Sequence, residues 1–332
     1  MYDIKLYQLT YGLKDLLKEK ILTKEDAVSM LNTHRKKYPV IYNIETTNIC
    51  NQTCAMCPRT TQMTRKLGTM KMPLFEKIVK QIKPWNDKEW NEWTTFVQNI
   101  VGIKENEMSE NHFFYCIIPK VITLHGFGEP LLDKHIVERV KLLTKHHIPS
   151  YFSCHPKNFD YEQGLKLAKA GLSYLKISSE KINDFDDYTK FEINSFIFAI
   201  PLLNGKTKVV IDVVGDQTAL KKLQKWFPKA YVYVKSQDNQ WYAGTKKKTP
   251  VAHLSGPCQF PWSSLTILWN GDVVPCNQDF NAEMKLGDAT TQSLWEIWNS
   301  KKYKDFRMLH LKLDKPLKCI DKCDMNCLVG EL

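Results

Sequence analysis

The stretch Val40-Ile41-Tyr42-Asn43-Ile44-Glu45-Thr46-Thr47-Asn48-Ile49-Cys50-Asn51-Gln52-Thr53-Cys54-Ala55-Met56-Cys57 joins an apolar, strand-like run to three cysteines at C-x3-C-x2-C spacing. Three thiolates can hold three irons of a four-iron cluster and leave the fourth iron open to a small-molecule ligand. A zinc ion would require a fourth ligand, and no fourth Cys or His lies nearby in the sequence. We therefore expect Cys50, Cys54 and Cys57 to be the ligands of a reactive [4Fe-4S] cluster.

Short apolar runs alternate with helical patterns between residues 40 and 234. Such alternation is typical of an α/β fold with a parallel sheet, whose ligand sites lie at the carboxyl ends of the strands. About six strands are expected, too few for a closed eight-unit barrel, so the sheet should be open or partial. The expected strands are Val40–Ile44, Val121–Leu124, Tyr151–Ser153, Tyr174–Ile177, Val209–Val214 and Tyr231–Val234, and the expected helices are Pro73–Ile82, His135–Leu143, Tyr161–Ala170 and Ala219–Trp226.

Other segments flank or interrupt this core, which we place at residues 40–240. Residues 1–39 are expected to form a helical extension in which Thr23 begins a second helix. Residues 84–119 are an aromatic-rich insertion, and this composition favours a helix and loop packed on the exterior of the barrel, with a lid or partner surface as the alternative. Residues 241–332 are expected to form a small domain that closes over the barrel mouth.

The composition of the chain indicates its compartment and the kinds of partner it binds. The 332 residues include no long apolar run, and the first twenty lack the apolar core of a secretory signal, so we expect a cytoplasmic protein. Ten cysteines in a reducing compartment stay free to bind metals. The net charge of +11 suits a solvated basic surface, an anionic substrate or an acidic electron donor. Nucleic acid is an unlikely partner, because no recognised nucleic-acid module is present.

A second motif, His125-Gly126-Phe127-Gly128-Glu129-Pro130, follows the expected strand Val121–Leu124. Glycine allows the backbone to approach a ligand closely, and a carboxylate accepts hydrogen bonds from an ammonium group. Together with the cysteine loop and the strand–helix alternation, this motif resembles the radical S-adenosylmethionine (radical SAM) superfamily, which implies a partial (β/α)6 TIM-like barrel. The resemblance also implies that the open iron binds SAM, which is cleaved to a 5'-deoxyadenosyl radical that abstracts hydrogen from a substrate.

The resemblance assigns roles to individual residues. Gly128 and Glu129 correspond to contacts with the SAM amine, Ser178 to a contact near the ribose, and Met56 to a side chain near the adenine. The turn after the third strand departs from the family pattern and carries Cys154. A thiol at a strand end could return a hydrogen atom to a substrate radical, although free cysteine more often packs in a core.

The remaining cysteines indicate a second metal site. Cys258 and Cys276 flank an Asn270-Gly271 hairpin turn in a C-x12-G-x4-C pattern that resembles the SPASM and twitch domains of radical SAM enzymes. The tail has fewer cysteines than a full SPASM domain. We therefore expect one auxiliary [4Fe-4S] cluster, with a structural zinc as the alternative. Its expected ligands are Cys258, Cys276 and two of Cys319, Cys323 and Cys327, with Cys319 and Cys323 the first choice.

The function implied by the resemblance is a radical SAM oxidoreductase. We expect it to dehydrogenate a small polar substrate, such as a sugar, cyclitol or nucleotide derivative, with a flavodoxin- or ferredoxin-like electron donor. Three alternatives remain open: an epimerase in which Cys154 donates hydrogen, a peptide- or protein-modifying maturase, and a metal-binding module without activity.

Overall fold

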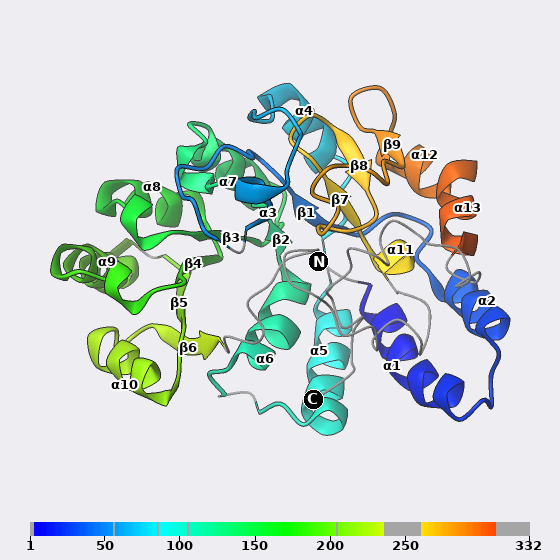
Figure 1. The fold of residues 1–332 in the computed structure, drawn as a ribbon, viewed down its shortest axis with the longest axis horizontal. Helices are drawn as coiled ribbons and strands as arrows, with labels where there is room; N and C mark the ends of the chain where they lie inside the picture. Colours follow the sequence, from blue (N-terminus) through cyan, green and yellow to red (C-terminus); the bar gives the residue numbers. More distant parts are fainter. Residues whose placement is uncertain are drawn as a thin grey trace.

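The computed structural model describes residues 3–55, 57–84, 86–104, 107–203, 205–235 and 260–309. The strands within these ranges form one sheet in the order β6-β5-β4-β3-β2-β1-β7-β8-β9 (Figure 1). They are β1 (Ile41–Ile44), β2 (Ile122–Thr123), β3 (Ser150–Cys154), β4 (Tyr174–Ser179), β5 (Lys208–Val214), β6 (Tyr231–Lys235), β7 (Leu265–Ile267), β8 (Asp272–Val274) and β9 (Gly287–Asp288).

The six strands from β1 to β6 pair in parallel, and each falls on a run predicted from the sequence. The sheet forms an open arc, so the expected partial α/β barrel is confirmed. The hairpin β7–β8 does not start a separate sheet in the described residues. Instead, β7 pairs in parallel with β1, and Leu265 lies opposite Ile41. The predicted boundary near residue 240 falls outside the described residues.

The helices of the repeating units cover the outer side of the arc, where Figure 1 shows α7 to α10 in sequence along one edge. Their apolar residues pack with strand residues such as Phe152 and Ile177 in the main hydrophobic core. The helices are α1 (Ile4–Lys18), α2 (Lys24–His34), α3 (Pro58–Thr61), α4 (Met72–Val79), α5 (Asp87–Phe96), α6 (Glu110–His112), α7 (Ile136–Lys145), α8 (Tyr161–Ala170), α9 (Asp187–Ala199), α10 (Gln217–Trp226), α11 (Phe260–Ser263), α12 (Leu294–Asn299) and α13 (Lys301–Leu309). None of these helices has both the length and the apolar composition needed to cross a membrane.

The aromatic insertion packs against the inner side of the arc, so its expected place on the barrel exterior is wrong. Successive residues of a strand face opposite sides of a sheet, and the inner-side residues Tyr151 and Tyr233 share a hydrophobic cluster with Trp93 and Phe113 of the insertion. The Phe113 ring lies 5.5 Å from the Tyr151 ring and 5.8 Å from the Tyr233 ring. An open sheet cannot bury its inner side alone, and the insertion supplies the missing apolar surface.

The N-terminal extension is helical as predicted, with Thr23 and Asp26 forming a capping box at the start of α2. It packs on the C-terminal part of the chain through Trp262 of α11, whose indole Nε1 donates to Asn32 Oδ1 at 2.8 Å. Near the other end of the described chain, Ser293 and Glu296 form a capping box at the start of α12.

Candidate active site

The cysteine loop begins at the carboxyl end of β1 and ends where Pro58 starts α3. The three cysteines are half-buried, and electrostatic interactions link Cys54 to both Cys50 and Cys57. A turn closes the loop, with the Cys57 amide donating to the Cys54 carbonyl at 3.2 Å. The three thiols that the sequence predicted as ligands thus lie on one loop at the carboxyl end of β1, and their role as cluster ligands stays a prediction.

The donor set fits a four-iron cluster. All three donors are thiols, the ligand type that iron–sulfur clusters take. In the described ranges no group of three or more Cys, His, Asp or Glu side chains is placed to hold a single metal ion. Burial and the nearby Glu180 carboxylate raise the pKa of Cys54 to about 11, so binding of iron must displace its proton.

The glycine motif packs directly beneath this loop. A Cβ atom at Gly128 would lie 2.2 Å from the Thr47 carbonyl oxygen, so only glycine allows the two backbones to meet there. The Glu129 amide donates to the Ile49 carbonyl at 2.8 Å and fixes the register of the two loops. The close packing against Thr47 is by itself enough to require glycine at position 128. The contact of Gly128 with SAM stays a prediction.

Glu129 ties the loops after β2 and β3 to the cysteine loop. Its carboxylate is 3% exposed and accepts hydrogen bonds from the amides of Leu131 at 3.1 Å and His155 at 2.8 Å. The Asn158 amide also donates to it at 3.0 Å, and Asn158 exchanges two hydrogen bonds with Asn51 between Cys50 and Cys54. Burial raises the pKa of Glu129 despite these donors. Its contact with the SAM amine stays a prediction.

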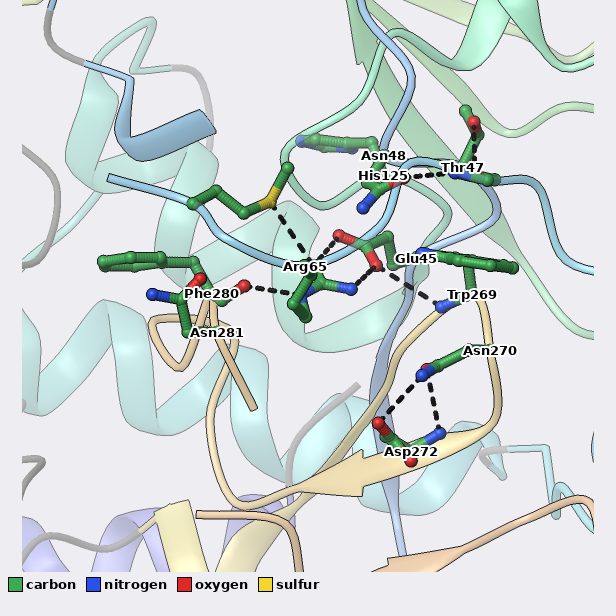
Figure 2. Close-up of polar contacts among 12 residues, drawn as sticks. Glu45, Thr47, Asn48, Arg65, His125, Trp269, Asn270, Asp272, Phe280 and Asn281 are labelled. Carbon is green, nitrogen blue, oxygen red and sulfur yellow. Dashed lines mark hydrogen bonds and ion pairs between the residues drawn. The ribbon is translucent and has the colours of Figure 1, made fainter. Parts of the chain in front are cut away.

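A buried ion pair that the sequence reasoning missed holds both ends of the cysteine region (Figure 2). The Glu45 carboxylate accepts bidentate hydrogen bonds from Arg65 Nη1 and Nη2 at 2.9 and 2.8 Å. The Trp269 amide donates to the same carboxylate at 3.3 Å, and Arg65 Nε donates to the Phe280 carbonyl at 2.5 Å. This pair, hereafter the Glu45–Arg65 clamp, joins the end of β1, the chain after the cysteines and the hairpin region.

The loop that carries Cys276 packs against the first cysteine loop. The Phe280 ring lies edge-on to the Phe127 ring at 5.9 Å, in a cluster that includes Cys57. The Thr64 amide donates to Asn281 Oδ1 at 2.8 Å, and Cys276 itself is half-buried. The other predicted ligands and the predicted adenine contact, Cys258, Cys319, Cys323, Cys327 and Met56, lie outside the described residues, so these assignments stay predictions.

A second buried ion cluster lies on the inner side of β4, β5 and β6. The Asp212 carboxylate is fully buried and lies between Lys176 Nζ at 2.9 Å and Lys235 Nζ at 3.1 Å. Lys176 also donates to Tyr233 Oη at 2.8 Å, and Lys235 to Ser178 Oγ at 3.0 Å. Burial acts to raise the pKa of Asp212, but the two ammonium groups outweigh it and the pKa lies below the usual value. We call this set the β4–β6 ion network.

The predicted residues Ser178 and Cys154 lie on opposite sides of the sheet. Ser178 faces the inner side in the ion network, whereas Cys154 is 3% exposed and packs in the outer-side core with Phe152 and Ile177. Burial raises the pKa of Cys154 well above its ordinary value. The structure gives Cys154 a packing role, and the hydrogen-donor and SAM-contact roles of these two residues stay predictions.

His125, the first residue of the glycine motif, contacts β3. Its Nδ1 accepts a hydrogen bond from the Ser153 amide at 3.1 Å, and burial, with the Lys176 charge, lowers its pKa to about 3. The ring is therefore neutral at pH 7 and carries its proton on Nε2. The imidazole can donate a hydrogen bond at Nε2 but cannot accept a proton there.

Comparisons with known proteins agree with this geometry. The SPASM family, an iron–sulfur cluster-binding domain, matches residues 258–328. A curated relative from Niallia circulans, named S-adenosyl-L-methionine-dependent 2-deoxy-scyllo-inosamine dehydrogenase, is 23% identical over 271 residues, which are 80% of this chain and 84% of the relative.

Two solved structures share the fold. The crystal structure of BtrN in complex with AdoMet and 2-DOIA has a TM-score of 0.55 at 15% identity, and the match covers 90% of this chain and 97% of BtrN. Native anSMEcpe with bound AdoMet has a TM-score of 0.50 at 14% identity, over 88% of this chain and 93% of that one.

The SPASM match and the shared fold together define the class: the chain has a C-terminal SPASM iron–sulfur cluster-binding domain and shares its fold with structures that bind AdoMet. The matched region contains all five of the cysteines predicted for the auxiliary site.

Proposed function

We propose that this protein oxidises a hydroxyl-bearing carbon of a small cyclitol to a ketone. The observation that carries the proposal is the similarity, along four-fifths of the chain, to a relative named as a SAM-dependent dehydrogenase of 2-deoxy-scyllo-inosamine. The half-buried thiols of the cysteine loop fit a [4Fe-4S] cluster, which when bound would supply the electron that cleaves SAM to a hydrogen-abstracting radical.

The chain's own residues build the chamber in which this chemistry would occur. The cysteine loop and the glycine motif lie at the carboxyl ends of neighbouring parallel strands, where ligands of such sheets bind. The aromatic insertion closes the inner side of the sheet below them, and this exclusion of water suits a site that must protect a radical.

Oxidation of an alcohol removes one hydrogen atom, one proton and one electron. The hydrogen atom would pass to the 5'-deoxyadenosyl group, the electron to the auxiliary iron–sulfur cluster of the SPASM domain, and the proton to a basic side chain. Neutral His125 is not the acceptor, because its Nδ1 already accepts a hydrogen bond and its Nε2 carries the proton.

The proposal is tested by anaerobic reconstitution with iron and sulfide, followed by incubation with SAM, dithionite and 2-deoxy-scyllo-inosamine. We expect one ketone per 5'-deoxyadenosine, and loss of both products when Cys54 is replaced by alanine. A protein that holds a reduced four-iron cluster but forms no 5'-deoxyadenosine would contradict the proposal.

Product analysis separates dehydrogenation from the alternatives. An epimerase would return an alcohol of unchanged mass and, if Cys154 is the donor, would lose turnover in Cys154→Ala. A dehydrogenase yields a product lighter by two hydrogens. A maturase would act on a peptide instead of the cyclitol, and a metal-binding module would leave SAM intact.

Partners and compartment belong to the same proposal. A flavodoxin- or ferredoxin-like donor would supply the reducing electron, and the net charge of +11 supports docking of such an acidic protein. A cytoplasmic location is supported by the ten cysteines, which a reducing compartment keeps free for iron. The anionic substrate predicted from the same charge is examined below.

A further inference from the structure

The β4–β6 ion network lies on the inner side of the sheet, next to the insertion. The Phe113 ring of the insertion lies 4.7 Å from Lys176 Nζ. Ser178 and Lys235 lie at the carboxyl ends of β4 and β6, and the cysteine loop leaves the carboxyl end of β1 in the same parallel sheet. Ligands of such sheets bind at this edge, and we call the network the floor of that edge.

The side chains of the network differ in how much of them is exposed to solvent. Asp212 is fully buried and Lys176 is 7% exposed, whereas Lys235 and Ser178 are half-buried. Lys176 is fully engaged, since it contacts Asp212, Tyr233 and the face of the Phe113 ring. Lys235 uses two of its three N–H groups within the described part of the chain, on Asp212 and Ser178. One of its three donors is thus not accounted for by contacts with the described residues.

A second carboxylate comes from the insertion. Glu110, the first residue of α6, is half-buried and interacts electrostatically with Lys176, Lys235 and Asp212. The Ser109 amide donates to Tyr231 Oη at 3.0 Å, which fixes the start of α6 against β6. The floor therefore contains two ammonium groups and two carboxylates.

This balance selects the kind of ligand. A phosphate ester would bring up to two negative charges to a site whose two ammonium groups already face two carboxylates, so little net positive charge remains to balance them. A ring that carries hydroxyl groups and one amine brings at most one charge. A hydroxyl oxygen can accept from the Lys235 ammonium, and an ammonium group can donate to the Glu110 carboxylate.

We infer that Lys235 and Glu110 contact the substrate, that Asp212 and Lys176 position Lys235 from behind, and that the substrate is a hydroxyl-rich ring bearing an amine rather than a phosphate. This inference rests on the proposed function for the location of the substrate. It goes beyond that function by naming the residues and the chemical group that they select. It also makes the insertion a determinant of specificity, because Glu110 belongs to it.

The test compares Lys235→Met and Glu110→Gln with two matched controls on the outer side of the sheet, Lys222→Met in α10 and Glu138→Gln in α7, both at exposed positions. Calorimetry with the anaerobic holoenzyme and SAM measures the Kd of 2-deoxy-scyllo-inosamine, of scyllo-inositol, which lacks the amine, and of an inositol monophosphate. Circular dichroism and iron content confirm that each variant is folded and loaded.

We expect Lys235→Met to raise the Kd of both unphosphorylated rings about 10- to 100-fold, the range for loss of a hydrogen bond to a charged group. Glu110→Gln should weaken binding of the aminocyclitol by a similar factor and leave scyllo-inositol within about twofold, while the controls bind as the wild type does. SAM cleavage without substrate should be unchanged in the two control variants.

The inference is overturned if Lys235→Met and Glu110→Gln bind the aminocyclitol as tightly as their controls, or if the wild type prefers the phosphorylated ring. Failure of the proposed function looks different. In that case the wild type would bind the aminocyclitol, with the predicted losses in the variants, but would form no 5'-deoxyadenosine.

Discussion

The Glu45–Arg65 clamp beyond the end of β1 and the β4–β6 ion network on the inner side of the sheet are both buried, yet they use their charges differently. In the clamp, one guanidinium meets one carboxylate, and their hydrogen bonds join three segments of chain. In the network, two ammonium groups share the Asp212 carboxylate, and the contacts of the more exposed one with the described residues use two of its three donors. Saturated pairing fits a structural role, whereas unused hydrogen-bonding capacity fits a binding role.

The largest expected effect is in the clamp. Arg65→Met leaves the fully buried Glu45 carboxylate without its cation, and removal of one partner from a buried ion pair costs about 3–5 kcal/mol of unfolding free energy. Urea denaturation of the full-length protein measures this loss. Arg65→Lys, which keeps the charge but not the bidentate geometry, should fall between Arg65→Met and the wild type. A loss in Arg65→Met no larger than that in Lys176→Met would contradict the expected difference between the clamp and the ion network.

The β4–β6 ion network should lose less stability than the clamp when one cation is removed. In Lys176→Met, Asp212 keeps Lys235 as its partner, and the methionine can still pack against Phe113 and Tyr233. We expect a loss of about 2 kcal/mol, the value for one hydrogen bond to a charged group. The same urea titration measures it. A loss as large as that of Arg65→Met would mean that the two lysines act as one unit.

The buried His125 ring, close to Lys176 of the ion network, makes the stability of the folded chain depend on pH. Its folded pKa of about 3 lies below the ordinary value of 6.5 because of burial and the Lys176 charge. The unfolded chain therefore binds a proton between these two pH values and the folded chain does not, so stability falls as pH falls, by about 1.4 kcal/mol per unit.

Unfolding titrations of the metal-free, full-length chain at pH 7, 6 and 5 check this slope, with His125→Asn as the reference that lacks the titrating ring. The difference between wild type and reference should grow as pH falls. Lys176→Met should reduce that difference, because it removes a charge that opposes protonation of His125. Equal slopes in the wild type and His125→Asn would count against the buried, neutral ring.

An exposed ion pair is expected to contribute the least to the free energy of unfolding. Lys301 and Asp305 pair at 2.6 Å on the surface of α13, four positions apart. We expect Lys301→Ala to cost about 0.3–0.5 kcal/mol in urea denaturation, an amount that added salt should diminish. A cost comparable to that of Lys176→Met would show that burial is not what separates the two buried clusters from ordinary surface pairs.

The sequence predicted the strands, the outer helices and the cysteine loop, because each depends on a local pattern. Apolar runs mark buried parallel strands, and Asn270-Gly271 marks the hairpin turn, where Gly271 has a φ of +95°. Thr23 also marks a helix start that the structure contains.

The insertion and the clamp could not be predicted in the same way. The aromatic residues of 84–119 indicate burial but not the surface that buries them, and Glu45 and Arg65 are joined only by the folded loop between them. The ion network did leave a signal. Lys176 in Tyr-Leu-Lys-Ile-Ser-Ser and Asp212 in Val-Val-Ile-Asp-Val-Val are charges within buried parallel strands, where an unpaired charge would be costly.

The pairing of β7 with β1 has a consequence for how the chain is made. Ile41 meets Leu265 only after more than two hundred further residues have been synthesised, which at ribosomal speeds takes roughly 10 to 45 seconds. During that interval one edge of β1 has no partner strand, next to a cysteine loop that has already emerged. We expect newly made chains to depend on chaperones and on timely delivery of iron and sulfide until the second half of the molecule covers that edge.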